Sequence, residues 1–172
     1  MMWRLIVIPI LLLGLIGGYL VATYNIPPSI RMPVVDATRN SYDQKSFGAP
    51  RAGHTHKGVD IFAKRGTPVV SATAGLVVFT GYLKLGGKAV SILSPDLTFL
   101  YYAHLDTILS TKMSWVSAGD TIGRVGNTGN AKNTPAHLHF SICRVLPYKK
   151  FFDPVPLLNA SFSVKQKSLA SF

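Results

Sequence analysis

Short apolar segments separated by glycine-containing turns dominate the chain from Ser46 onward, and this pattern restricts the possible folds more than any other feature. The segments are rich in β-branched and aromatic residues, which favour strands. They are TPVVSA (67–72), GLVVFTGY (75–82), KAVSIL (88–93) and LTFLYYAHL (97–105), with TIGRVG between the turn sequences SAGD (117–120) and GNTGN (126–130). Few windows keep a helical period. We therefore expect an all-β domain with an antiparallel, two-layer architecture.

The N-terminal residues have a different character, because the chain carries no charge from Leu5 to Ala22. That length is about what a helix needs to cross the hydrocarbon core of a bilayer. A cleaved signal peptide usually has a shorter apolar stretch, and Leu20 is a poor fit to a cut after Ala22. We therefore expect residues 1–23 to form an uncleaved signal anchor, that is, one transmembrane helix.

The rest of the chain divides into three parts. Residues 24–45 carry several prolines among polar residues and are expected to form an extended linker. Residues 46–160 contain the strand pattern and form the domain, and FFDPVPLL (151–158) is expected to pack back on it. Residues 161–172 are expected to be a flexible tail.

Composition excludes several classes of function. The chain contains no glutamate, which rules out the HExxH metalloproteases and the use of glutamate as acid or base in glycosidases. A single cysteine, Cys143, rules out an intrachain disulfide. The formal net charge of +11 predicts an acidic partner. The basic residues are scattered and form no nucleic-acid-binding motif, so nucleic acid is not the expected partner.

The histidines are concentrated in short motifs. HTHKGVD holds His56 and Asp60, YYAHL holds His104, and HLHF holds His137 and His139. Strand alternation along HLHFSICR places the last two imidazoles on one face, about 7 Å apart, with the apolar residues on the opposite, core-facing side. Both imidazoles can therefore address one metal site.

A catalytic zinc ion takes three protein ligands and keeps one position open for water. His56, Asp60 and one histidine of the HLH pair supply such a set, and Gly58 allows the backbone to turn closely between the first two. The residues alone do not choose between His137 and His139.

These residues admit two other interpretations. A lone histidine is more often a half-buried core residue than a metal ligand, and His54 is interpreted in that way. A structural zinc site favours a closed, cysteine-rich shell, which Cys143 alone does not supply. Chance is a poor explanation for His-x-His, His-xxx-Asp and a further strand histidine in a chain with so few histidines.

The motifs from FGAPRAGHTHKGVDIFAKRGTPVVSATAGLVVFTG through YYAHL to VSAGDTIGRVGNTGNAKNTPAHLHF closely resemble the lysostaphin-type (LytM-like) peptidoglycan endopeptidases. The resemblance covers about residues 47–144, with the motifs in the same order. It implies the lysostaphin-type fold with a groove-type site, and one Zn²⁺ bound by His56, Asp60 and His139. It also implies that His104 and His137 are catalytic histidines beside the metal.

The expected activity is zinc-dependent hydrolysis of peptide bonds in peptidoglycan stem peptides or crosslinks. Zinc would activate water, and because the chain has no glutamate, His137 or His104 would act as general base. The expected location is the inner (cytoplasmic) membrane, single-pass, with the domain in the periplasm or outside the cell.

The alternative function is that of a non-catalytic relative, a wall-binding module that activates another cell-wall hydrolase. Such a relative should lack motif residues, and here the five positions are intact. The stretch VSAGDTIG also resembles hairpins of biotinyl- or lipoyl-type carriers. No lysine occupies the usual acceptor setting, and a carrier leaves the histidines unexplained, so that interpretation is rejected.

Overall fold

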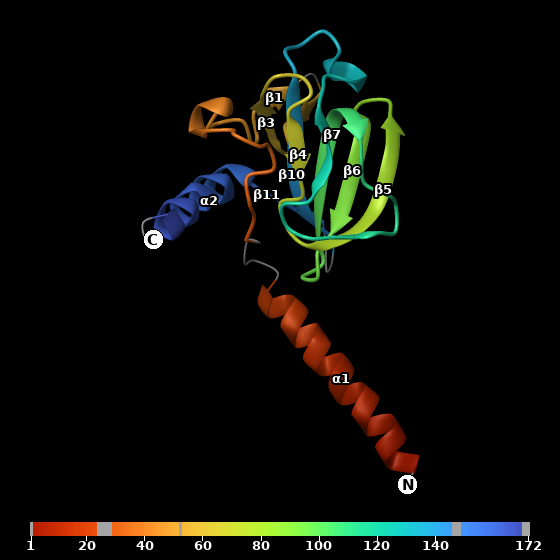
Figure 1. Ribbon diagram of the computed structural model, residues 1–172. Coiled ribbons are helices and arrows are strands. Elements are labelled where there is room, and N and C mark those ends of the chain that lie inside the picture. Colours follow the sequence, from red (N-terminus) through yellow and green to blue (C-terminus); the bar gives the residue numbers. More distant parts are fainter. Residues whose placement is uncertain (1, 24–28, 52, 146–148, 170–172) are drawn as a thin grey trace.

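The computed structural model describes residues 2–23, 29–51, 53–145 and 149–169 (Figure 1). Six of the eleven strands in the described residues fall on segments that the sequence predicts, whereas those at 50–51, 54–55, 59–62, 115–116 and 150–152 are not predicted. The strands are β1 (Pro50–Arg51), β2 (His54–Thr55), β3 (Val59–Phe62), β4 (Pro68–Val70), β5 (Gly75–Leu83), β6 (Gly87–Leu93), β7 (Thr98–Ile108), β8 (Trp115–Val116), β9 (Thr121–Val125), β10 (His137–Arg144) and β11 (Lys150–Phe152). Within the described residues each named strand pair is antiparallel, so the predicted antiparallel β architecture is confirmed.

Nine of these strands form one sheet that branches at β7. The main path runs β11-β10-β7-β6-β5-β8, and β3 pairs with β10. Strand β9 pairs with the C-terminal part of β7 and also with β4, so these two strands leave the main path. Figure 1 shows β4 in front of β10, where it covers one face of the main sheet. The two layers therefore belong to a single branched sheet.

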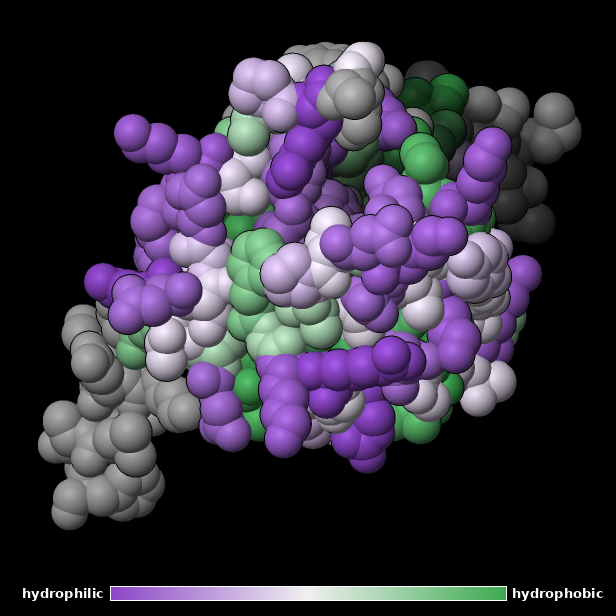
Figure 2. Space-filling model, turned by 90° about the horizontal axis from the view of Figure 1, so that it is seen from above, coloured by the Kyte–Doolittle hydropathy of each residue, from purple (hydrophilic) through white to green (hydrophobic). Residues whose placement is uncertain are grey.

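The apolar core includes residues from both arms of this sheet. Val69 of β4 belongs to the same buried cluster as Leu138, Phe140 and Ile142 of β10. The three β10 residues alternate along the strand, which confirms the core face predicted for HLHFSICR. The histidines of β10 consequently stand on the opposite face, away from the core. Seen from above, the molecule presents mainly hydrophilic side chains, with apolar ones visible between them (Figure 2).

The segment predicted as an extended linker is part of the folded domain from Ile30 onward. Ile30, Val34 and Tyr42 are buried in the core, and a short 3₁₀ helix, η1 (Arg39–Ser41), lies between the last two. The segment runs beside β4, where the Val70 N–H donates to the Pro33 carbonyl at 2.8 Å. The linker prediction fails here because the free edge of β4 offers backbone partners to an extended chain, which composition does not reveal. Residues 24–28 of the predicted linker lie outside the described residues.

Helix α2 (Pro154–Leu169) follows β11, although the sequence analysis expects no helix in this region. The Asp153 carboxylate accepts a hydrogen bond from the Val155 N–H at 2.9 Å, and Pro154 stands at the first helical position, where its missing N–H is not needed. Val155 and Leu158 are buried, so the predicted packing of 151–158 on the domain is confirmed. The helix continues to Leu169, through most of the segment predicted as a flexible tail.

Helix α1 (Met2–Thr23) coincides with the apolar N-terminal segment. Its described side chains are largely exposed, at 53–70% for the isoleucines and leucines between Ile8 and Ile16. The side chains of α1 are described for residues 7–18, and within the described part of the chain a helix with the length and hydropathy of a membrane span is not found.

The packing of residues 30–45 on the domain predicts a stability effect at Val34, whose side chain is 1% exposed. Val34→Ala should lower the free energy of unfolding by about 1–3 kcal/mol, because it removes buried methyl groups. The neighbouring Val35 is 38% exposed, so Val35→Ala is the matched control and should have a much smaller effect. Urea unfolding of the two variants measures the difference. Equal, small changes would contradict the packing described here.

Candidate metal centre

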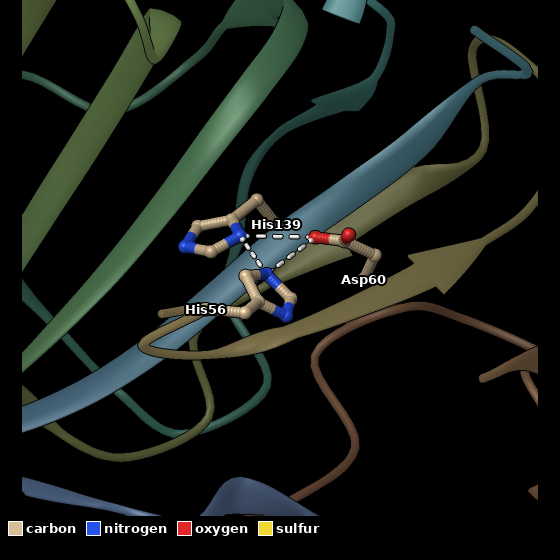
Figure 3. Close-up of side chains that lie close together, drawn as sticks. All are labelled: His56, Asp60 and His139. Atoms are coloured by element: carbon tan, nitrogen blue, oxygen red, sulfur yellow. Dashed lines mark hydrogen bonds and ion pairs between the residues drawn. The ribbon is translucent and has the colours of Figure 1, made fainter. Parts of the chain in front are cut away.

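The candidate metal centre forms where β3 pairs with β10. Asp60 lies directly opposite His139 in the strand register, so both side chains stand on the same side of the sheet. His56 precedes β3 and faces both of them (Figure 3). The Asp60 Oδ1 atom lies 3.1 Å from His56 Nε2 and 2.9 Å from His139 Nδ1, and the two nitrogens are 3.0 Å apart.

Gly58 allows the segment that carries His56 to lie against β10. A side-chain carbon at Gly58 would lie 2.4 Å from the Phe140 carbonyl oxygen and 3.0 Å from His139 Nε2. Since real contacts of this kind are not that short, only glycine fits. The sequence predicts a role for Gly58 in a turn between His56 and Asp60, and the structure adds this close approach to β10.

Hydrogen bonds outside the cluster leave two of its inner atoms, His56 Nε2 and Asp60 Oδ1, with lone pairs directed into it. The His56 Nδ1–H donates to the Ser46 carbonyl at 2.8 Å, which leaves a lone pair on Nε2 of the neutral ring. The Arg51 guanidinium donates to the Asp60 Oδ2 atom at 2.8 Å and leaves Oδ1 facing the histidines. Such outer partners orient metal ligands in known sites.

These three atoms fit a tetrahedral cation. Zinc-to-ligand distances of about 2.0–2.1 Å place tetrahedral ligand atoms ~3.3 Å apart, close to the separations seen here. Two imidazole nitrogens and one carboxylate oxygen are also the donor types that zinc takes in catalytic sites. Without a cation, their lone pairs would face one another with too few protons between them. His56, Asp60 and His139 could therefore hold a metal ion.

The electrostatics of the cluster favour a charged carboxylate. Burial by itself would raise the pKa of Asp60, but its interactions with His139 and His56 outweigh burial and hold its pKa below the ordinary value. Asp60 is consequently ionised at neutral pH, which suits binding of a cation.

His104 and His137 stand beside this cluster. The His104 Nδ1–H donates to the Thr128 carbonyl at 2.9 Å, and the His137 Nδ1–H donates to the Pro135 carbonyl at 2.8 Å. The two ring centroids are 5.0 Å apart, and that of His104 is 5.9 Å from the ring of His139. Because both Nδ1 atoms are occupied, the Nε2 atoms of the neutral rings carry the lone pairs.

Desolvation on burial, together with the nearby His137, lowers the pKa of His104 to about 4. His104 is therefore neutral at pH 7 and able to accept a proton.

The histidines line a cleft of about 610 Å³. Apolar groups form much of its remaining surface, including Phe62, Leu85, Ala131 and Pro135. A cleft of this size with a few convergent polar groups is typical of a ligand or substrate site.

The structure brings the five predicted site residues to this one cleft; they are His56, Asp60, His104, His137 and His139. The side chain of His54, interpreted from the sequence as a core residue, lies outside the described part of the chain. Sequence reasoning missed Arg51, because an exposed arginine on the short strand β1 gives no signal of its contact with Asp60. It also missed the backbone carbonyls that orient the histidine rings, because every residue has a carbonyl and the sequence does not indicate which of them contacts a ring.

Comparisons with known proteins agree with these motifs. The pattern of Peptidase family M23 matches residues 54–154. The L-Ala--D-Glu endopeptidase of Bacillus subtilis is 34% identical over 126 residues, which are 69% of this chain and 38% of that protein. The peptidoglycan DD-endopeptidase ShyA of Vibrio cholerae is 36% identical over 118 residues, 68% of this chain and 26% of that protein. The murein hydrolase activator NlpD of Escherichia coli is 34% identical over 99 residues, 57% of this chain and 25% of that protein.

Solved structures show the same relationship. The catalytic domain of lysostaphin from Staphylococcus simulans is 30% identical, with a TM-score of 0.61, and the match covers 72% of this chain and 99% of that domain. A zinc containing peptidase from Vibrio cholerae is 27% identical, with a TM-score of 0.52, over 71% of this chain and 36% of that protein. The chain thus spans well under half the length of the first two curated relatives, and what it shares with them is one domain. Since the family pattern covers more than half of the chain and the fold agrees, the protein belongs to peptidase family M23 and is homologous to the lysostaphin-type peptidoglycan endopeptidases.

Proposed function

We propose that this protein is a zinc-dependent endopeptidase that hydrolyses peptide bonds in peptidoglycan stem peptides or crosslinks. The observation that carries the proposal is the convergence of four imidazoles and one carboxylate in a single cleft, with the rings oriented by backbone carbonyls. A cluster that only stabilised the fold would not need four imidazoles facing an open cleft.

In this proposal His56 Nε2, Asp60 Oδ1 and His139 Nδ1 hold one Zn²⁺. When bound, zinc supplies a Lewis acid that polarises a carbonyl and lowers the pKa of water. The Arg51 guanidinium holds the second carboxylate oxygen, so that Oδ1 stays directed at the metal position.

His104 and His137 move protons through their Nε2 atoms. One of the two rings, in its neutral form, accepts the proton of the attacking water, and the other, in its protonated form, donates to the oxygen that becomes negative in the transition state. Both rings are fixed at Nδ1 by carbonyl groups, which directs both Nε2 atoms away from those contacts. This preorganisation is what proton transfer in a defined geometry requires.

The substrate class rests on the relatives and on charge. Of the similar proteins, one is named as an L-Ala--D-Glu endopeptidase and another as a peptidoglycan DD-endopeptidase. A net charge of +11 suits a substrate whose stem peptides carry carboxylates. The relatives act on different bonds, so the bond cut by this protein is left to experiment.

The likeness to the activator NlpD supports a second candidate function, that of a wall-binding module that activates another hydrolase. That role needs the fold and a binding surface, but not the histidines. The two candidates therefore differ in whether substitution of a single cleft histidine abolishes the effect on the wall.

Digestion of purified crosslinked sacculi by the full chain in detergent, with the fragments identified by mass spectrometry, tests the proposal. After a muramidase has cut the glycan strands, we expect monomeric muropeptides at the expense of dimers if a crosslink is cleaved, and shortened stem peptides if a stem bond is cleaved. Asp60→Ala and His139→Ala should lose both zinc and activity, because each removes a ligand. His104→Ala should keep zinc and lose about 10²–10⁴-fold in turnover, because it removes one proton-transfer group. Unchanged crosslinks and stem peptides after incubation with the zinc-loaded protein would instead favour the activator role.

We further propose that α1 anchors the protein in the inner (cytoplasmic) membrane, with the domain in the periplasm or outside the cell. The uncharged sequence from Leu5 to Ala22 and the exposed apolar side chains of α1 support this proposal.

Anchoring predicts that the full chain sediments with membranes, withstands high salt and is released by detergent, because the hydrophobic effect and not charge would hold it. Immunoblotting of cell fractions measures this distribution. Recovery of a soluble form that lacks its N-terminal residues would contradict anchoring and show a cleaved signal.

A further inference from the structure

A β-bulge turns His104 toward the cleft. In the register between β6 and β7, Lys88 lies opposite Leu105 and Val90 opposite Tyr102, so β7 holds one extra residue at this point. Tyr102 and Leu105 both face the core and are fully buried. Strict alternation would send His104 to the core as well, and the bulge is what brings it to the other face.

This conformation is strained and needs support. His104 has a φ of 62°, in the left-handed region that residues other than glycine rarely adopt. Its N–H, displaced from the regular ladder, donates to the Gly86 carbonyl at 2.7 Å. The Gly86 carbonyl is therefore one fixed point for the bulge.

Thr128, in the GNTGN loop, provides the other fixed points. Its carbonyl accepts from the His104 ring at 2.9 Å, and its N–H donates to the His104 carbonyl at 3.4 Å. Its hydroxyl accepts from the Lys88 N–H at 2.9 Å and donates to the Leu105 carbonyl at 2.8 Å. The hydroxyl thus bridges two backbone groups on facing strands where the bulge interrupts the ladder.

Two glycines let Thr128 come this close. A side-chain carbon at Gly87 would lie 2.2 Å from the Thr128 hydroxyl oxygen, and one at Gly129 would lie 2.3 Å from the Gly87 nitrogen. Both glycines also have positive φ, 62° and 71°. The GNTGN loop and the β5–β6 turn are therefore packed backbone to backbone, and this contact fixes the position of Thr128 relative to the bulge.

We propose that Thr128 is a positioning residue, whose hydroxyl locks the loop onto β6 and β7 so that its carbonyl holds the His104 ring with Nε2 presented to the cleft. The assignment rests on the proposed peptidase function, which it deepens. It also gives the GNTGN loop a role other than that of a plain turn.

Thr128→Val keeps the shape of the side chain and removes the hydroxyl, whereas Thr128→Ser keeps the hydroxyl. With zinc-loaded protein and a purified dimeric muropeptide, we expect Thr128→Val to lower kcat by about 10- to 100-fold, as small displacements of catalytic groups do. KM and zinc content should change little. Thr128→Ser should restore kcat to near the wild-type value. Thr121→Val, at an exposed site on β9 away from the cleft, is the matched control and should leave kcat unchanged.

Long-range ¹H–¹⁵N NMR of the zinc-loaded wild-type protein provides a readout that does not depend on a variant folding. We expect His104 to carry its proton on Nδ1, and Thr128→Val to mix the two tautomers. A wild-type His104 protonated on Nε2 would overturn the proposal, as would equal kcat values for Thr128→Val and Thr128→Ser. If the wild-type protein cleaves no muropeptide, the proposed function fails, and the tautomer of His104 still decides the positioning role.

Discussion

The pairing of β3 with β10 is the interaction on which the site depends. Its register places Asp60 opposite His139, and a slip by one residue would send one of the two side chains to the core face. On its other side β10 pairs with β7, where Ala103 lies opposite His139 and precedes His104. One central strand, held between two partners, therefore sets the positions of both the metal cluster and the neighbouring imidazoles. The apolar residues of β10 fix that register by their burial, so the core and the site are specified by the same strand.

Backbone carbonyls, and not carboxylates, orient the rings of His56, His104 and His137. A carbonyl only accepts a hydrogen bond, so each contact requires the proton on Nδ1 and leaves a lone pair on Nε2. A carboxylate in the same place would add negative charge and raise the pKa of the ring beside it. With neutral acceptors, Asp60 remains the only carboxylate among the described residues that line the cleft. The chain thus orients its histidines without the glutamates it lacks, and it keeps His104 neutral.

Sequence reasoning predicted the longer strands and named five residues that the structure brings to one cleft, because strand alternation and histidine spacing are local properties. The alternation of polar and apolar residues in the HLHF motif indicates which face of the strand is buried. Gly58 is the point where the segment with His56 lies against β10. The remainder depends on tertiary context. Burial of Val34 against β4 and the contact between Arg51 and Asp60 join segments whose own composition is that of a loop. The bulge at His104 could not be predicted from the sequence for a related reason. The contacts that support it come from Thr128, more than twenty residues further along the chain.

The conformation of His104 bears on the choice between a hydrolase and a binding module. A left-handed backbone at a residue other than glycine costs about 1–3 kcal/mol, and it persists only where surrounding contacts impose it. Here those contacts direct an imidazole away from the core and hold one tautomer, while burial disfavours its charged form. A module that only binds the wall needs neither the tautomer nor the strain, and an ordinary strand residue would serve it better. A proton acceptor beside a metal needs both. Asp36, Leu97 and Met113 also have positive φ, so the backbone conformation alone does not mark a catalytic residue. What distinguishes His104 is the combination of this conformation with a ring held at Nδ1 beside the histidine cluster, as the proposed hydrolase requires.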